Sequence, residues 1–204
     1  MNYPLAAAKD LAVIRSLLER ATYYRTISGP TALVSAVLAL ASTTLILTTD
    51  SSPSSFLIVW LAALAATIVF NAALILIGAR KNNQPFISPA MRHALAAVSP
   101  AMLTGASLGI LATLVHQSPS YAALIWIFSY GIALCATSSF APQSIRRLGL
   151  SFIIAGCACL TALYFIPQVT TLTTVKAGAV FMGATFGLLH LIYAGCIGLR
   201  TSES

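Results

Sequence analysis

The chain has 204 residues, of which 58% are apolar and only 7% are charged, and its mean hydropathy is +0.91. Soluble domains carry charge on about 25% of their residues, so this composition excludes an ordinary water-soluble domain. A formal net charge of +7 in a soluble protein would indicate nucleic-acid binding. Here the basic residues flank apolar runs, where anionic membrane lipid is the expected partner. We therefore expect membrane lipids as partners and no direct contact with nucleic acid.

Six apolar runs are long enough to cross the hydrocarbon layer as helices, which takes about 20 residues each. In chain order they cover residues 30–48, 56–79, 95–115, 121–140, 148–166 and 175–199. Prolines and short polar segments separate them, with Pro30 opening the first run and Pro167 closing the fifth. The sequence predicts an all-α protein with a six-helix transmembrane domain over residues 29–200 and a short cytoplasmic tail at 201–204.

Lysine and arginine are distributed unevenly between the two sides that these runs define. With alternating loops, ten of the eleven basic residues fall on one side and Lys176 falls on the other. The ten are Lys9, Arg15, Arg20, Arg25, Arg80, Lys81, Arg92, Arg146, Arg147 and Arg200. Since positively charged flanks are retained in the cytoplasm, the sequence predicts cytoplasmic amino and carboxyl termini.

The two tryptophans have similar positions in their runs. Trp60 and Trp126 each precede a basic-side arginine, Arg80 or Arg146, by 20 residues. That separation is about 30 Å of helix. Because indole rings are enriched at membrane interfaces, we expect both near the external interface.

The first 28 residues are predicted to form an amphipathic helix. Leu11, Ile14, Leu17, Leu18 and Ala21 fall on one side of a helical wheel, and Lys9, Arg15, Ser16, Glu19 and Arg20 fall on the other. Such a helix lies along a membrane surface. The polar face around Arg15, Glu19 and Arg20 is therefore a candidate surface for lipid or for a cytoplasmic protein partner.

Few polar side chains lie inside the predicted spans. Asn71, Ser138 and His190 each lie within ten residues of a following basic-side arginine, so we expect them at a similar depth. They are candidate ligand-binding residues in the cytoplasmic half of the bundle, and interhelical hydrogen bonds and haem ligation by His190 are the alternatives. No Asp or Glu lies in a span, which argues against a transporter coupled to protons or sodium.

Metal and cofactor binding receive little support from the cysteines. The four cysteines, Cys135, Cys157, Cys159 and Cys196, all lie in predicted spans. Cys157 and Cys159 are two residues apart, and such positions on a helix point about 200° apart, so they cannot readily share a metal. We expect no metal site and no cofactor.

Glycines four residues apart occur in two predicted spans, as Gly105 and Gly109 and as Gly183 and Gly187. Such pairs allow close approach of a neighbouring helix, and helix packing is their predicted role. The first pair also gives Gly105-Ala106-Ser107-Leu108-Gly109 the G-x-S-x-G pattern of serine hydrolases. That pattern marks a strand-to-helix turn rather than the middle of a span, so we interpret the match as coincidental.

Several short motifs resemble an uncharacterised family of small bacterial six-helix membrane proteins. They are Ile14-Arg15, Leu18-Glu19-Arg20-Ala21-Thr22, Ser28-Gly29, Tyr130-Gly131, Arg147-Leu148-Gly149, Gly156 and Phe186-Gly187-Leu188-Leu189-His190. The chain departs from the family pattern at Leu18, where methionine is usual, and at Pro30 and Ala32, where glycines are common. The resemblance implies a bacterial cytoplasmic (inner) membrane. Genes of that family often lie beside one for a winged-helix regulator, and the resemblance thereby implies a cytoplasmic protein partner.

The sequence leaves three hypotheses for function. The first is a non-enzymatic structural or regulatory membrane protein that engages a partner or lipid through its N-terminal helix. The second is a small-molecule binder or uncoupled facilitator that uses Asn71, Ser138 and His190. The third is an intramembrane hydrolase with Ser107 as nucleophile. An oligomer is compatible with each of them.

Overall fold

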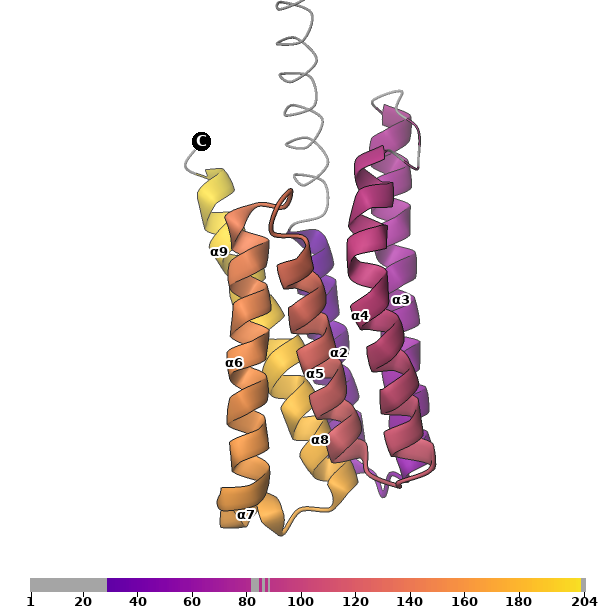
Figure 1. The fold of residues 1–204 in the computed structure, drawn as a ribbon, viewed down its shortest axis with the longest axis vertical. Helices are drawn as coiled ribbons and strands as arrows, with labels where there is room; N and C mark the ends of the chain where they lie inside the picture. Colours follow the sequence, from indigo (N-terminus) through magenta and orange to yellow (C-terminus); the bar gives the residue numbers. More distant parts are fainter. Residues whose placement is uncertain (1–28, 82–84, 86, 88, 203–204) are drawn as a thin grey trace, which may run out of the picture.

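A computed structural model describes residues 29–81, 85, 87 and 89–202 of the chain (Figure 1). The regular structure of these residues is entirely helical. In chain order the elements are α2 (Pro30–Thr48), α3 (Pro53–Lys81), α4 (Pro89–Leu114), α5 (Pro119–Ala136), α6 (Gln143–Phe165), α7 (Pro167–Thr170), α8 (Thr174–Met182), the π-helix η1 (Gly183–Leu189) and α9 (His190–Ser202). The predicted interfacial helix at residues 1–28, with the candidate surface of Arg15, Glu19 and Arg20, lies outside the described residues.

The predicted fold class is confirmed. Six helices are long and apolar enough to cross a membrane, the sixth running through α8, η1 and α9. Large apolar side chains such as Ile58, Val69 and Ile154 are more than 60% exposed on the outside of the bundle. This is expected where lipid rather than water surrounds the helices. The chain is therefore a multi-pass membrane protein.

Several helix ends differ from the predicted boundaries, including the starts of α3 at Pro53 and of α6 at Gln143, which precede the predicted residues 56 and 148. α4 begins at Pro89 rather than at residue 95, because a proline is well accommodated in the first helical turn. α5 ends at Ala136 rather than at residue 140, because Thr137 and Ser138 donate backbone N–H groups to carbonyls three residues back and so tighten the last turn. α9 continues to Ser202, so the predicted tail at 201–204 begins within a helix.

The alternating directions of the helices collect basic residues at one end of the bundle. The α3–α4 and α5–α6 connections and the carboxyl end of α9 lie together at the top of Figure 1. The described residues near that end include Arg80, Lys81, Arg92, Arg146 and Arg147. Asp50, His116 and Lys176 lie in or beside the connections at the opposite end. The two ends of the bundle therefore differ strongly in positive charge.

α5 lies inside the bundle and packs against α4, α6 and α8. It approaches α6 closely at two glycines. A Cβ placed on Gly149 of α6 would lie 2.9 Å from the carbonyl oxygen of Gly131 in α5, and one placed on Gly131 would lie 3.0 Å from the carbonyl oxygen of Gly149. The absence of side chains at these two positions therefore allows the backbones of α5 and α6 to meet.

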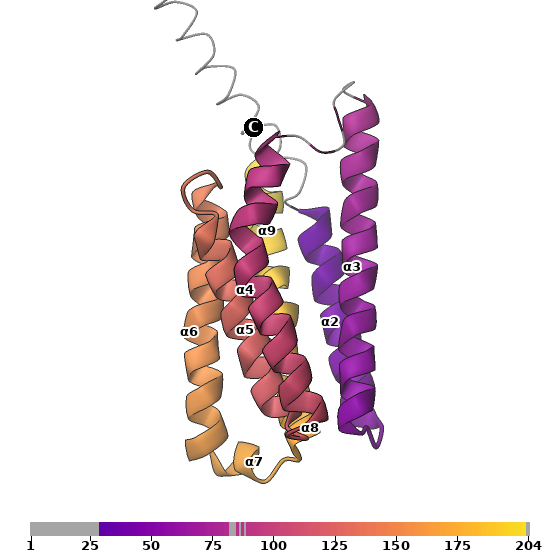
Figure 2. The same ribbon diagram turned by 45° about the vertical axis from the view of Figure 1, so that its right-hand side comes forward.

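α3 lies at the outer edge of the bundle in both views (Figures 1 and 2). Its buried residues are Phe56, Leu57 and Trp60, all in its first turns. Beyond Trp60 its side chains are exposed or only partly buried wherever the structure describes them. α3 also contacts α4 much less than α4 contacts α5. This loose packing on one side of α3 adjoins the cavity described below.

Candidate functional site: an intramembrane cavity

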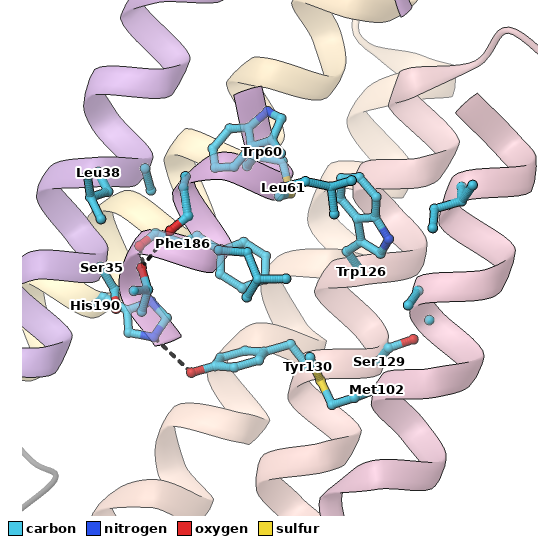
Figure 3. A pocket seen from close by; sticks show the side chains of 18 residues that line it. Ser35, Leu38, Trp60, Leu61, Met102, Trp126, Ser129, Tyr130, Phe186 and His190 are labelled. Atoms are coloured by element: carbon cyan, nitrogen blue, oxygen red, sulfur yellow. Dashed lines mark hydrogen bonds between the residues drawn. The ribbon is translucent and has the colours of Figure 1, made fainter. Parts of the chain in front are cut away.

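A cavity of about 190 Å³ lies within the bundle between α3 and the helices that face it (Figure 3). Its lining residues are Ser35, Leu38 and Ala39 of α2, Trp60, Leu61, Ala63, Leu64 and Thr67 of α3, Met102, Gly105, Ala106 and Ile110 of α4, Trp126, Ser129 and Tyr130 of α5, Met182 of α8, Phe186 of η1 and His190 of α9. An apolar protein cavity of about 150 Å³ is large enough to bind benzene. This cavity can therefore hold one or two small rings or a short length of chain.

The chemistry of the lining is aromatic and uncharged. Trp60, Trp126, Tyr130 and Phe186 contribute four aromatic rings, and the lining includes no Asp, Glu, Lys or Arg. The polar atoms come from a few hydroxyl groups and the His190 imidazole. Ligand sites are commonly mostly apolar with a few placed polar groups that fix orientation. The cavity matches that description for an uncharged ligand.

His190 is the best-defined polar group in the cavity wall. It is only 5% exposed, and both of its ring nitrogens are hydrogen-bonded. Nδ1 lies 3.0 Å from the carbonyl oxygen of Phe186, which can only accept, so Nδ1 carries a proton and donates. In the neutral imidazole Nε2 then accepts from the Tyr130 hydroxyl, 2.9 Å away. This second bond ties α9 to α5 and is the dashed line between the two side chains in Figure 3.

The π-helix just before His190 provides the carbonyl that the imidazole uses. In an α-helix the backbone N–H of His190 would bond the carbonyl of Phe186. Here that N–H bonds the carbonyl of Gly187, and the Phe186 carbonyl accepts from the imidazole Nδ1. Short π-helical segments are frequent at functional sites. η1 therefore sets the direction in which the imidazole faces.

An aromatic cluster supports the Tyr130–His190 pair from behind. Phe152 of α6 is fully buried, and its ring centroid lies 4.8 Å from that of Tyr130, 4.9 Å from that of Phe186 and 5.4 Å from that of His190. All three contacts are edge-on, the geometry that aromatic quadrupoles favour. Phe152 thus holds the cavity wall in place from the side of α6.

We expect Tyr130→Phe to cost about 1 kcal/mol of stability, the usual worth of an interhelical hydrogen bond in a membrane protein. The substitution removes the hydroxyl that donates to His190 and retains the ring. Unfolding in mixed micelles, measured for the two single variants and for the double variant with His190→Phe, would give the coupling energy. Additive effects of Tyr130→Phe and His190→Phe would contradict the assigned hydrogen bond.

The three predicted ligand residues are not gathered around the cavity. Of Asn71, Ser138 and His190, only His190 lines it. Asn71 Oδ1 accepts a 3.0 Å hydrogen bond from the Thr31 hydroxyl and so joins α3 to α2. Ser138 is exposed in the turn after α5. Counting residues from the arginines predicts depth but not rotation about the helix axis, so the predicted cluster separates into unrelated contacts.

Both predicted glycine pairs lie against a neighbouring helix. A Cβ on Gly105 would lie 2.5 Å from Ser129 Cβ, and a Cβ on Gly109 would lie 2.0 Å from Trp126 Nε1. Both neighbours belong to α5. On the sixth span, Gly183 and Gly187 face α2 in the same way, with the nearest atoms belonging to Thr43 and Leu40.

Ser107, between the first two glycines, is exposed on the other side of α4. Within the described ranges no hydrogen bond joins Ser107 to a histidine, since His190 bonds Tyr130 and Phe186. The residue that the G-x-S-x-G pattern would make a nucleophile is therefore not part of the cavity. The pattern coincides here with a helix-packing contact.

Sequence reasoning missed most of the cavity. Trp60 and Trp126 were expected near the external interface and were given no part in a site; Trp60 is only 6% exposed and lies in the cavity wall with Trp126. Ser129 and Tyr130 were not predicted as site residues. Tyr130 does occur in the Tyr130-Gly131 motif of the family resemblance, but no sequence feature assigns it or Ser129 to a site.

The cysteines, histidines and acidic residues form no metal site in the part of the chain that the structure describes. Cys135, Cys157, Cys159 and Cys196 are free thiols. No group of three or more His, Cys, Asp or Glu side chains lies close enough to hold an ion. Because both nitrogens of His190 are engaged, its imidazole has no lone pair free for haem iron.

No family model, no curated protein and no solved structure matches this chain. The resemblance to small bacterial membrane proteins therefore stays a prediction. Any functional assignment depends on the geometry and chemistry of the cavity.

Proposed function

We propose that this protein is a non-enzymatic integral membrane protein that binds an uncharged, mostly apolar small molecule inside its helical bundle. The observation that carries the proposal is the cavity of about 190 Å³, lined by four aromatic side chains and no charged one. Open space of this size between packed helices forfeits packing contacts along its lining. A bound molecule would restore those contacts.

The hydrogen bonds around His190 support binding rather than chemistry. A general base needs a free lone pair within reach of a substrate proton. His190 Nδ1 donates to a backbone carbonyl, and Nε2 accepts from Tyr130. The imidazole is thus suited to orienting the Tyr130 phenol, whose oxygen retains capacity to accept a further hydrogen bond.

We place the protein in a bacterial cytoplasmic membrane with both termini in the cytoplasm. The orientation is supported by the collection of arginine and lysine at the end of the bundle that carries the α3–α4 and α5–α6 connections. The opposite end carries Lys176 and Asp50 as its described charges. The bacterial membrane itself is supported by the family resemblance alone.

Mass spectrometry of the protein released gently from its own membranes tests the proposal. We expect a discrete small molecule to stay bound to the 21.3 kDa chain and to its His93→Leu variant. His93 is exposed and does not line the cavity. In His190→Leu the fraction of protein that carries the molecule should fall at least about tenfold. The substitution removes a wall residue and leaves the Tyr130 hydroxyl without its acceptor.

The comparison requires that both variants elute as single folded species. Protein that carries only ordinary membrane lipid, in the same amount in all three forms, would contradict binding in the cavity. Equal retention of the small molecule by His190→Leu and His93→Leu would place it elsewhere on the bundle.

A further inference from the structure

The wall of the cavity is buried on one side and exposed on the other. Ala39, Met182 and His190 on the inner wall are 4%, 4% and 5% exposed. On the side of α3, Leu61 and Leu64 are 42% and 46% exposed, and Ala106 of α4 is also exposed. Residues that line the cavity and also reach the outer surface form its rim. The cavity therefore opens sideways, between α3 and α4, to whatever surrounds the bundle.

The depth of this opening identifies its surroundings. The α3 residues of the wall, Trp60 to Thr67, lie seven to fourteen residues after Pro53. At the rise of an α-helix this is about 10–21 Å from that end of the helix. The hydrocarbon layer is about 30 Å thick, so this interval lies among acyl chains. A molecule reaching the cavity through the rim would therefore come from the hydrocarbon of the bilayer.

Two hydroxyl oxygens of the wall have unused hydrogen-bonding capacity. Ser129 Oγ has no hydrogen-bond partner among the residues that the structure describes, and it lies against Gly105 on the α4 side of the cavity, away from the Tyr130 hydroxyl (Figure 3). Tyr130 Oη donates to His190 and can still accept. An apolar chain alone would leave the Ser129 hydroxyl unpaired, whereas a carbonyl or hydroxyl oxygen could accept from it.

The rings of the wall favour a planar occupant. Trp60 and Trp126 come from α3 and α5, and Tyr130 and Phe186 extend the aromatic surface toward His190. Aromatic faces and edges attract other rings by about 0.5–1.5 kcal/mol beyond the area that they bury. The lack of a carboxylate in the wall argues against a cationic occupant, which would enter an apolar site without a counter-charge.

We infer that the cavity takes the head of a ring-bearing lipid, namely a planar, uncharged ring with a carbonyl or hydroxyl oxygen, of the quinone and phenol class. The ring enters sideways from the hydrocarbon layer and lies among Trp60, Trp126 and Tyr130, with its oxygen toward Ser129. Its apolar tail passes out through the rim between Leu64 and Ala106. The inference rests on the proposed function and names the ligand class for the same cavity.

The two tryptophans provide the test, because they are the only two in the chain and both line the cavity. The probes are 2-methyl-1,4-naphthoquinone and the same ring with a short isoprenoid tail, titrated against the protein in lipid nanodiscs. We expect saturable quenching of tryptophan fluorescence, with tighter binding of the tailed ring.

Three variants make the test specific. Ala106→Phe should weaken binding at least about tenfold, because it places a ring in the rim. Ser129→Ala should weaken it about two- to tenfold, the effect of one hydrogen bond. Ala158→Phe, on an exposed position of α6 outside the cavity, should bind like the unsubstituted protein.

Two outcomes would overturn the inference. Quenching that rises linearly with the quinone concentration, without saturation and equally in all variants, would mean that the quinone is only dissolved in the bilayer. Displacement of the quinone by a straight-chain alcohol at equal concentration would show that the cavity prefers an acyl chain. If neither quinone binds while the purified protein still carries another discrete small molecule, the ligand class is wrong and the proposed function stands.

Discussion

Phe152→Ala should destabilise the bundle by about 3 kcal/mol, the usual cost of removing a fully buried phenylalanine ring. The ring has no exposed surface and contacts Tyr130, Phe186 and His190. Lipid cannot replace these contacts, because the site is enclosed by protein. The loss would be measured from the midpoint and slope of unfolding in mixed micelles.

Phe165→Ala is the matched control, with the same substitution on the same helix. Phe165 is 79% exposed at the end of α6, so its removal should change the stability by less than about 0.5 kcal/mol. Ligand retention should also fall in Phe152→Ala, since the ring holds the Tyr130–His190 pair in place. Similar stability losses for the two variants would contradict the assigned position of α6 in the bundle.

Gly178→Ala is expected to destabilise the protein by about 1–3 kcal/mol, the usual cost of overpacking. A Cβ on Gly178 of α8 would lie 2.8 Å from the carbonyl oxygen of Pro119 and 2.9 Å from its carbonyl carbon. These are backbone atoms at the start of α5, so they cannot move aside as the end of a side chain can. α8 and α5 would have to separate.

Gly195→Ala should have the opposite effect. No atom lies within 4 Å of a Cβ placed on Gly195 in α9, so the alanine is free of clashes. It should then show the intrinsic preference of alanine for helix, a stabilisation of up to about 1 kcal/mol. The free energies of unfolding of the two variants separate the effect of close helix packing from that of helix propensity. Equal changes in Gly178→Ala and Gly195→Ala would contradict the packing of α8 on α5.

The spans were predictable because lipid imposes a simple rule. Every backbone polar group in the hydrocarbon layer must be bonded internally, so a long apolar run becomes a helix. The prolines at residues 30, 53, 89 and 119 each stand at the start of a helix, as their missing N–H predicts. The end of α5 was harder to place, because apolar residues resume at Phe140 after three hydroxyl residues. The hydroxyl side chain of Thr137 bonds the Leu134 carbonyl and helps to close the turn that ends the helix before them.

The cavity could not be predicted in the same way. Asn71 and His190 have similar depths, but one bonds Thr31 and the other bonds Tyr130, because rotation about each helix decides which neighbour a side chain meets. The spacing of Gly105 and Gly109 indicates a close helix contact without identifying α5 as the partner. The cavity itself depends on the loose packing of α3 against α4, which no local sequence pattern encodes.

We expect a small uncharged molecule to occupy the space among Trp60, Trp126, Tyr130 and His190. The most direct test is an electron cryo-microscopy map of the protein purified from its own membranes in nanodiscs, with an antibody fragment to increase its size. We expect compact, flat density in contact with the two indole rings and continuous with density in the opening between α3 and α4. A map in which α3 packs against α4 at the level of Leu61 and Leu64, so that the protein's own side chains fill the cavity, would contradict a bound molecule there.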